Sequence, residues 1–298
     1  MVSPHPSSST SSYFTSFLTS SIACIFANLV THPLETIKTR QQLVSSSKTI
    51  SVTSITKQIV KNEGFNGLYK GLNASLLRAV ISGAGRLTTF EFLKENCTRY
   101  GLLSKKHSNQ PTELPLRAGL AVSSGSFAAL LSSPIDMVRT KQAADASNKN
   151  LSVFQVLLNV LRKDRIHGLF AGSNALMLRA ATFNLGQLMS YDYFKCYTME
   201  YFDLPSTHVT THVLASLGAG LIASTISIGI ENIKTVQQVG SPSGSLSIIG
   251  VTRDLYRIGG IMHFFRGWST LWAKVGPHTF IVFVTAEFLR EKANIEGF

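Results

Sequence analysis

Three stretches of this 298-residue chain share one pattern: P-L-E-T-I-K-T-R-Q (Pro33–Gln41), P-I-D-M-V-R-T-K-Q (Pro134–Gln142) and G-I-E-N-I-K-T-V-Q (Gly229–Gln237). The second begins 101 residues after the first, and the third begins 95 residues after the second. All three keep an acid, a base three residues later and a final glutamine, but the third has glycine in place of proline and Val236 in place of the second base. This spacing predicts three copies of one unit of about a hundred residues.

Other features recur at the same offsets, which a chance motif would not explain. They are a glycine two residues after an aromatic residue, an acid followed three residues later by a base, and two small residues four apart. In chain order these are Gly71, Gly172 and Gly267; Glu91 with Lys94, Asp192 with Lys195 and Glu287 with Arg290; and Ala23 with Ala27, Ser124 with Ala128 and Ala219 with Ala223. The small pairs predict close packing of neighbouring helices.

Each unit reads as two long helices joined by a short amphipathic segment. The first stretch, for example 13–37, is mostly apolar, long enough to cross a hydrocarbon layer of ~30 Å, and is expected to end at the proline motif. The pattern predicts an all-α membrane protein with six transmembrane helices. We divide the chain into a Ser/Pro-rich tail (1–12) and repeats 13–100, 112–202 and 206–298; the short segments are 51–62, 152–163 and 247–257, and the second long helices are 72–97, 173–199 and 268–291.

Composition supports a membrane protein and argues against an enzyme. Hydrophobic residues make up 44% of the chain and charged residues 15%, against about 25% in soluble domains. The net charge of +12 indicates an anionic partner, although nucleic acid fits badly with so apolar a chain. Phosphate-loop, zinc-protease and serine-hydrolase motifs are missing, and the three cysteines and eight histidines show no metal-ligand spacing. We therefore expect no catalytic site, metal or cofactor.

The triple P-x-[DE]-x-x-[KR] motif resembles the mitochondrial carrier family over nearly the whole chain. The resemblance implies a threefold pseudosymmetric six-helix barrel with three short matrix helices, multi-pass in the mitochondrial inner membrane, that exchanges solutes by alternating access. Three stretches are similar to the dicarboxylate, oxoglutarate and uncoupling-protein group, with Lys274 where that group usually has arginine: L-N-A-S-L-L-R (72–78), R-A-A-T-F-N-L-G-Q-L-M-S-Y-D (179–192) and A-K-V-G-P-H-T (273–279).

The resemblance assigns the repeated charges to two gates. At the matrix gate each acid would pair with the base of the next repeat, namely Glu35 with Arg139, Asp136 with Lys234 and Glu231 with Lys38, braced by Gln41, Gln142 and Gln237. Exposed pairs contribute only ~0 to 1 kcal/mol each, so we expect this gate to open at modest cost. The cytoplasmic gate would use Glu91, Lys94, Asp192, Lys195, Glu287 and Arg290. The alternatives are solvated charges at helix ends and ordinary surface pairs.

Arg78, Arg179 and Lys274 each lie 13 residues before an even-helix acid, about 20 Å along the helix. Cations inside a membrane are costly unless they face water or an anion, so we expect them to converge on one aqueous pocket. By resemblance they are the substrate contact points, together with Ala180, and three positive contacts favour a di- or keto-carboxylate. Candidate further contacts are Arg86, Asn184 and Gln187, with helix packing as the alternative for the two amides. For the three cations the alternatives are snorkelling to the membrane surface or pairing with a buried acid.

Lipid and partners are the last expectations. Gly71, Gly172 and Gly267 precede helix N-termini, where amide groups bind phosphate, so the resemblance implies bound cardiolipin; simple glycine capping is the alternative. A transporter would work as a monomer on small anionic metabolites in contact with membrane lipid. The alternative function is a structural subunit of a respiratory-chain assembly, with that complex's subunits as partners, because Gly229 and Val236 depart from the pattern.

Overall fold

The computed structural model describes residues 7–44, 51–101, 114–146, 151–202, 205, 209–240 and 247–292. Within these ranges all regular secondary structure is helical, as predicted. The long helices are α1 (Ser7–Gln42), α3 (Leu72–Arg99), α4 (Leu114–Ala144), α6 (Ser173–Phe202), α7 (Val209–Val239) and α9 (Trp268–Lys292). The short ones are α2 (Val52–Glu63), α5 (Val153–Leu169) and α8 (Ile248–Gly259), with 3-10 turns η1 (Phe65–Tyr69) and η3 (Ile261–Phe265).

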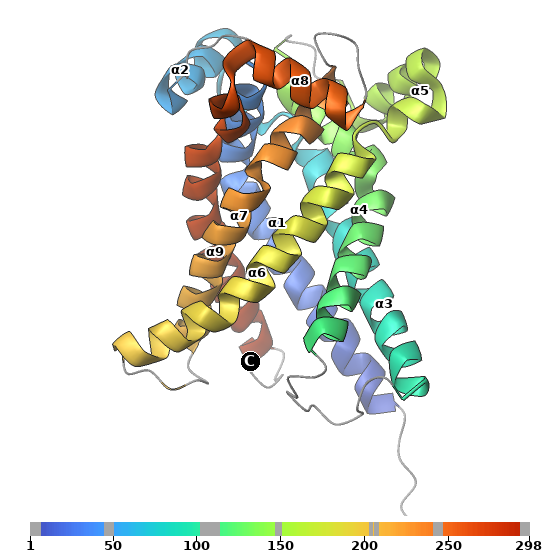
Figure 1. Ribbon diagram of the computed structural model, residues 1–298, viewed down its shortest axis with the longest axis vertical. Coiled ribbons are helices and arrows are strands. Elements are labelled where there is room, and N and C mark those ends of the chain that lie inside the picture. The colour runs from blue at the N-terminus through green and yellow to red at the C-terminus, as the bar shows by residue number, and fades with distance from the viewer. Residues whose placement is uncertain are drawn as a thin grey trace, which may run out of the picture.

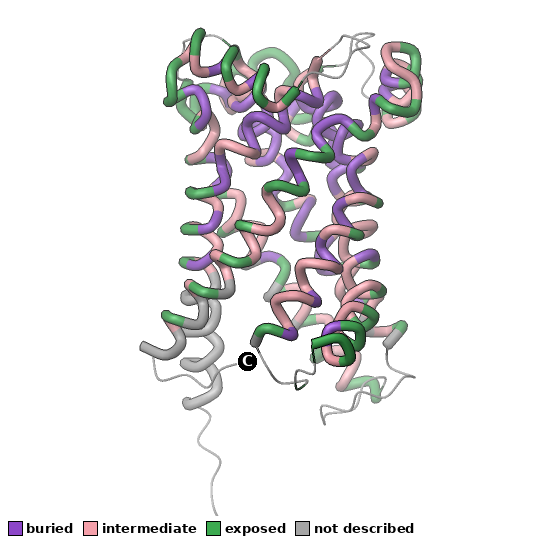
Figure 2. Tube along the Cα trace, turned by 90° about the vertical axis from the view of Figure 1, so that its left-hand side faces the viewer, coloured by how far each residue is buried: buried purple, intermediate pink, exposed green. Residues whose placement is uncertain are grey.

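The long helices form a closed ring. In chain order α1 packs on α3, α3 on α4, α4 on α6, α6 on α7, α7 on α9, and α9 returns to α1 (Figure 1). The first long helices of the three repeats, α1, α4 and α7, also contact one another. Buried residues concentrate at the end of the bundle that carries α2, α5 and α8 (Figure 2). The bundle is therefore closed most tightly at this end, which we call the short-helix end.

The small residues spaced four apart pack the ring, as predicted. Ala23, Ala27, Ser124, Ala128, Ala219 and Ala223 are all at most 1% exposed. On α6, a Cβ added to Gly186 would lie only 3.1 Å from the Cα of Ala223 on α7. Such short distances between helices require small side chains on both surfaces.

Each short helix covers the short-helix end with an apolar stripe. Buried residues recur four positions apart, as expected of amphipathic helices: Ile55 and Ile59, Val156 and Val160, and Val251 and Leu255. Val236, which replaces a base of the motif, packs in the apolar cluster with Val251 and Leu255. The substitution therefore extends the core beneath α8.

One helix start differs from the expectation, because α1 begins at Ser7, inside the stretch that we assigned to a tail. Helices α1 and α4 contain Pro33 and Pro134 and end at Gln42 and Ala144, close to the last residues of their motifs, as expected. A proline removes one backbone donor but does not prevent a helix from continuing when packing holds the following turns. Here those turns are held by the buried charged contacts described below.

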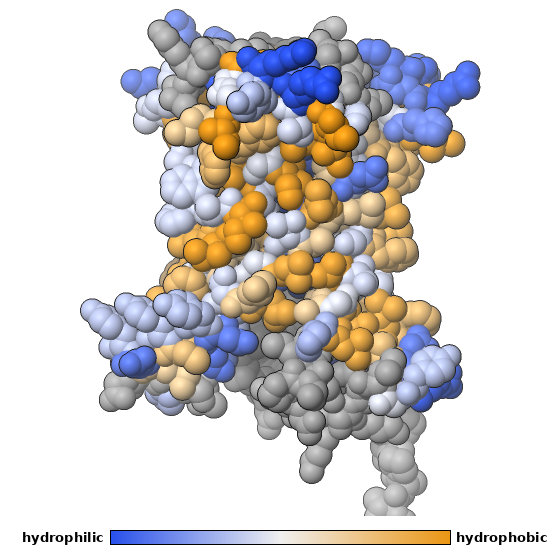
Figure 3. Space-filling model, in the orientation of Figure 1, coloured by the Kyte–Doolittle hydropathy of each residue, from blue (hydrophilic) through white to orange (hydrophobic). Residues whose placement is uncertain are grey.

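Two of the described helices, Ala118–Ala144 and Thr210–Val239, are long and apolar enough by themselves to cross a membrane. Six membrane spans therefore remain a prediction. One face of the molecule shows apolar side chains across the middle of the bundle and hydrophilic ones toward both ends (Figure 3). This is the distribution that a bilayer requires of a protein surface.

Candidate functional site

Three ion pairs join α1, α4 and α7 at the short-helix end. They connect the acid of one repeat to the base of the next, at the positions that the motif specifies. The distances are 2.6 Å for Arg139 Nη1 to Glu35 Oε1, 3.1 Å for Lys234 Nζ to Asp136 Oδ2, and 2.9 Å for Lys38 Nζ to Glu231 Oε1. Because all three helices are involved, the pairs close the centre of the ring.

These side chains are buried, and the expectation of exposed pairs was wrong. None of the six is more than 8% exposed. The helix turns that follow Pro33 and Pro134 bring the charges to the ring axis instead of to solvent. Removing one partner of a buried pair leaves an uncompensated charge, which costs about 3–5 kcal/mol. The closure is therefore held more firmly than surface pairs would hold it.

The three candidate contact cations bind the same three acids. Arg78 Nε lies 2.7 Å from Asp136 Oδ1, Arg179 Nε lies 2.7 Å from Glu231 Oε2, and Lys274 Nζ lies 2.5 Å from Glu35 Oε2. Of the alternatives that the sequence left open, pairing with a buried acid is the one that the structure contains. The acids come from helices remote in sequence, so local inspection did not find them. We call the three acids and the six bases that contact them the charged cluster; its members are Glu35, Asp136, Glu231, Lys38, Arg139, Lys234, Arg78, Arg179 and Lys274.

Arg179 and Lys274 also face an open cavity of about 420 Å³ lined by residues of α6, α7 and α9. Its polar lining includes Gln187, Glu231, His278 and several hydroxyl side chains. Arg78 is not among the residues that line this cavity, so a single pocket shared by all three cations stays a prediction. Its guanidinium instead points to Asp136 on α4.

The other candidate contacts separate into one lining residue and three that lie elsewhere. Asn184 Nδ2 donates to the backbone carbonyl of Ala121 on α4 at 3.4 Å, which is the packing alternative. Ala180 is partly buried beside Arg179, and Arg86 is exposed on α3; neither lines the cavity. Gln187 remains as the neutral hydrogen-bonding group on the cavity wall.

Gln238 hydrogen-bonds to an acid of the ion pairs, and it lies one residue beyond Gln237, the position expected to brace them. Gln238 Nε2 donates to Asp136 Oδ2 at 3.0 Å, and its Oε1 accepts from Thr140 at 2.6 Å. In the equivalent place Gln42 accepts from Thr235 at 2.9 Å. Neither contact was predicted from the sequence, although the glutamine doublets at 41–42 and 237–238 were a visible signal.

The expected glutamines have other described contacts. Gln142 Nε2 donates outward to the carbonyl of Leu151 at 2.8 Å, so this residue does not brace the ion pairs. Gln41 accepts from Thr270 on α9 at 2.5 Å, and Gln237 is buried on α7. The bracing role that we predicted for Gln142 was therefore wrong, because its side chain lies on the outer side of α4.

The second set of repeated charges lies at the opposite end of the bundle. The side chains of Glu91, Glu287 and Arg290 are outside the described residues. Of the others, Lys94 and Asp192 are exposed and Lys195 is partly buried. Pairing at this end therefore stays a prediction.

Gly71, Gly172 and Gly267 begin α3, α6 and α9 with backbone φ angles of 83°, 76° and 78°, which glycine adopts without strain. Each also packs on a base of the ion pairs. An added Cβ would lie 3.0 Å from the Arg139 carbonyl, 3.3 Å from the Lys234 carbonyl and 3.0 Å from Lys38 Cγ, respectively. These glycines therefore have a packing role, in agreement with the capping alternative.

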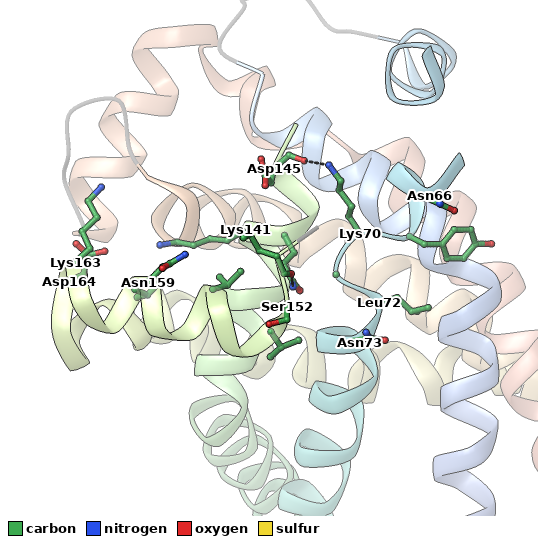
Figure 4. Close-up of a pocket in the computed structure, with 17 residues that line it drawn as sticks. Asn66, Lys70, Leu72, Asn73, Lys141, Asp145, Ser152, Asn159, Lys163 and Asp164 are labelled. Carbon is green, nitrogen blue, oxygen red and sulfur yellow. Dashed lines mark hydrogen bonds between the residues drawn. The ribbon is translucent and has the colours of Figure 1, made fainter. Parts of the chain in front are cut away.

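Beside Gly71 lies a surface groove of about 770 Å³ between the start of α3 and α5 (Figure 4). Lys70, Lys141 and Lys163 line it, together with Asp145 and Asp164. Lys70 Nζ donates to the Asp145 carbonyl at 3.0 Å. The groove therefore offers helix amides and two further ammonium groups to a ligand.

Comparison with known proteins supports the same reading of the repeats. A family model described as "Mitochondrial carrier protein" matches residues 9–101, 111–202 and 205–296. The chain is 32% identical over 273 residues to "Mitochondrial citrate transporter F" of Aspergillus niger, covering 89% of this chain and 85% of that protein. It is 30% identical over 271 residues to "Mitochondrial dicarboxylate transporter" of Saccharomyces cerevisiae, covering 90% and 89%. These comparisons give no support to the structural-subunit alternative.

Proposed function

Because the chain belongs to the mitochondrial carrier family, we propose that it exchanges small di- or keto-carboxylates across the mitochondrial inner membrane by alternating access. Relatives named as citrate, dicarboxylate and 2-oxoglutarate/malate carriers support this class of solute. The observation that carries the proposal is that Arg179 and Lys274 face one cavity and are also partners of the acids that close the ring.

The charge balance of the cluster favours a dianion. Six bases surround three carboxylates, which leaves three positive charges in excess. Arg179 presents a planar fork suited to a carboxylate, and Lys274 presents a point charge. A solute with two carboxylates makes a charge-assisted hydrogen bond to each of them.

Binding at these cations is coupled to the closure. When the solute's carboxylates bind Arg179 and Lys274, Glu231 loses its contact with Arg179 and Glu35 loses its contact with Lys274. Both acids then rely on the remaining bases, so the free energy needed to separate α1, α4 and α7 falls. In this proposal the solute opens the matrix gate by competing for the partners of its acids.

The gate that closes in the other state uses the repeated charges at the opposite end. Tyr191 directly precedes Asp192, and its hydroxyl lies 2.6 Å from His212 Nδ1 on α7. We assign Glu91, Lys94, Asp192, Lys195, Glu287 and Arg290 to this gate from their equivalent repeat positions. Closure would require α3, α6 and α9 to approach one another at that end.

Lipid binding belongs to the same proposal. The groove beside Gly71 combines helix amides with lysines at the short-helix end, where anionic headgroups lie if this end faces the matrix. Cardiolipin is the proposed ligand there and beside Gly172 and Gly267, and the transporting unit is a monomer.

Exchange across liposomes tests the function. Purified protein is reconstituted into liposomes loaded with unlabelled malate, and uptake of labelled malate, oxoglutarate, citrate, phosphate and sulfate is measured. We expect carboxylate uptake that depends on internal malate and falls at least tenfold in Arg179→Gln and Lys274→Gln. Lys57→Gln, which removes an exposed cation on α2, is the matched control. Folded protein that takes up no carboxylate, or variants that equal the control, would reject the proposal.

A further inference from the structure

Three highly exposed apolar side chains occupy one equivalent position in the three repeats. They are Phe65, Ile166 and Ile261, with exposed fractions of 75%, 66% and 68%, and their spacings are again 101 and 95 residues. Each directly follows a residue with a positive φ angle, at which the chain leaves the regular geometry of the short helix. A single exposed apolar residue needs no explanation, but recurrence at one position in every repeat indicates a common contact.

This position lies at the rim of the short-helix end. In each repeat it comes after the buried stripe of α2, α5 or α8 and before the glycine that begins the next long helix. Figure 1 shows the three short helices spread around that end of the bundle. The chain therefore passes Phe65, Ile166 and Ile261 where the end surface meets the sides of the bundle, which face lipid in a membrane carrier.

An exposed base stands four residues before each of these apolar side chains. The three bases are Lys61, Arg162 and Arg257. The second repeat adds Arg165 at the positive-φ position itself, with φ at 55°, where the other repeats have Gly64 and Gly260. Glycine adopts this conformation without strain and arginine does not. The second repeat therefore keeps a further exposed charge next to Ile166 at a cost in backbone strain.

The threefold placement favours a lipid surface as the partner. Side chains on three sides of a ring cannot be covered together by one docking protein, whereas a bilayer surrounds the ring on every side. Basic and apolar side chains close together are also typical of segments that lie in the interface of a membrane with anionic lipids. Hydrophilic side chains over α8 border on hydrophobic ones toward the middle of the bundle (Figure 3), which is the order that this interface requires.

We propose that Phe65, Ile166 and Ile261 insert into the lipid leaflet at the short-helix end. In the same proposal Lys61, Arg162 and Arg257 bind the anionic headgroups of that leaflet, so that each short helix anchors the protein at the membrane surface. The anchor differs from the groove beside Gly71, which none of these six residues lines. The inference concerns the membrane and does not depend on which solute the protein carries.

Fluorescence quenching tests the insertion. The three native cysteines are replaced by serine, and a fluorophore is attached at Phe65→Cys, Ile166→Cys or Ile261→Cys. Each protein is reconstituted into vesicles of phosphatidylcholine and phosphatidylglycerol, and quenching by a nitroxide on the upper acyl chain is compared with quenching by aqueous iodide. Lys57→Cys is the control, because Lys57 is exposed on the face of α2 opposite its buried stripe. We expect the nitroxide to quench the three rim labels about twofold more than the control, and iodide to quench them less.

Thermal unfolding tests the charges. Melting temperatures are measured in vesicles of phosphatidylcholine, without and with phosphatidylglycerol, for the wild type and for the triple variant Lys61→Gln/Arg162→Gln/Arg257→Gln. We expect phosphatidylglycerol to raise the melting temperature of the wild type by about 5 °C at low salt, because a lipid that binds the folded state stabilises it. The triple variant should lose most of this rise. Arg99→Gln, which removes an exposed base at the opposite end of the bundle, should respond as the wild type does.

Cardiolipin in place of phosphatidylglycerol separates this anchor from the glycine grooves. A cardiolipin response that persists in the triple variant while its phosphatidylglycerol response is lost supports two distinct lipid sites. Rim labels that the nitroxide quenches no more than the control, or a triple variant with the full phosphatidylglycerol response of the wild type, overturn the inference.

Discussion

Lys274 Nζ lies 2.5 Å from Glu35 Oε2 and joins the last long helix of the chain to the first. The other oxygen of Glu35 accepts from Arg139 at 2.6 Å and from Lys38 at 2.9 Å. One carboxylate thus holds a cavity-facing cation and two bases of the closure. A change at Lys274 is therefore transmitted directly to the contacts that hold α1 against α4.

Removal of Glu35 should cost more stability than removal of Lys274. Glu35→Gln leaves three cations without their common acid, and we expect a loss of about 3–5 kcal/mol. Lys274→Gln should cost less, because Glu35 keeps two bases. The double variant should lose less than the sum of the single variants, since neighbours in one network are coupled. Thermal unfolding of purified protein measures all three.

Glu200→Gln, which removes an exposed acid near the end of α6, serves as the matched control and should be within about 0.5 kcal/mol of wild type. Strict additivity of Glu35→Gln and Lys274→Gln would mean that the contact seen in the structure carries no coupling energy.

The repeat explains why so much of the closure was predictable. The repeat supplied an acid and a base three residues apart on each first helix, and the resemblance to the carrier family supplied the pairing of each acid with the base of the next repeat, so that Glu35 was matched with Arg139. The second partner of each acid was not predictable. Whether Lys274 reaches Glu35 depends on how far α9 and α1 approach, and spacing within one helix carries no such information.

The contacts of side chains that break the threefold pattern could not be predicted from the sequence either. Repeat position assigned a bracing role to Gln142 and none to Gln238, yet Gln142 contacts Leu151 outside the ring and Gln238 contacts Asp136 inside it. A shift of one residue rotates a side chain by about 100° around a helix, which decides between the axis and the surface.

Gly229, where the other two repeats have proline, offers a test of the helix that carries it. The nearest atom to an added Cβ is Phe264 Cβ at 3.7 Å, an ordinary contact. Gly229→Ala should therefore stabilise the protein by about 0.5–1 kcal/mol, because alanine loses less backbone entropy in a helix. Gly186→Ala is the matched control and should destabilise it, since its Cβ would lie 3.1 Å from Ala223 Cα. Melting temperatures that move in the same direction would contradict the packing described here.

Glu63 ties α2 to α1 and to the turn that precedes α3, and its carboxylate predicts a pH dependence of stability. Its carboxylate accepts from Arg40 at 2.8 Å and pairs with Lys70 at 2.6 Å. Burial would raise the pKa of Glu63, but the hydrogen bonds and charges of Arg40 and Lys70 outweigh it and lower the pKa below the ordinary 4.5. A carboxyl whose pKa is lowered by folding contributes stability above its unfolded pKa and loses it as the pH falls through the folded value.

Glu63→Gln should therefore be less stable than wild type by about 2 kcal/mol at pH 7, with the difference shrinking below about pH 4.5. Unfolding curves at pH 7 and at pH 4 check this. Glu95→Gln, at an exposed position on α3, should show little change at either pH. A deficit of Glu63→Gln that is the same at both pH values would show that shape, not charge, holds α2 in place.

Gln238 supplies the sharpest contrast between repeat position and observed contact. Its amide donates to Asp136 Oδ2 at 3.0 Å and accepts from Thr140 at 2.6 Å, and the side chain is 1% exposed. Gln238→Ala leaves both partners buried with one hydrogen bond fewer, and we expect a loss of about 1–3 kcal/mol. Gln142→Ala should cost less than about 0.5 kcal/mol, because its bond to Leu151 lies at the surface. Thermal unfolding of the two variants side by side decides the question, and a larger loss for Gln142→Ala would restore the glutamine assignment made from the motif.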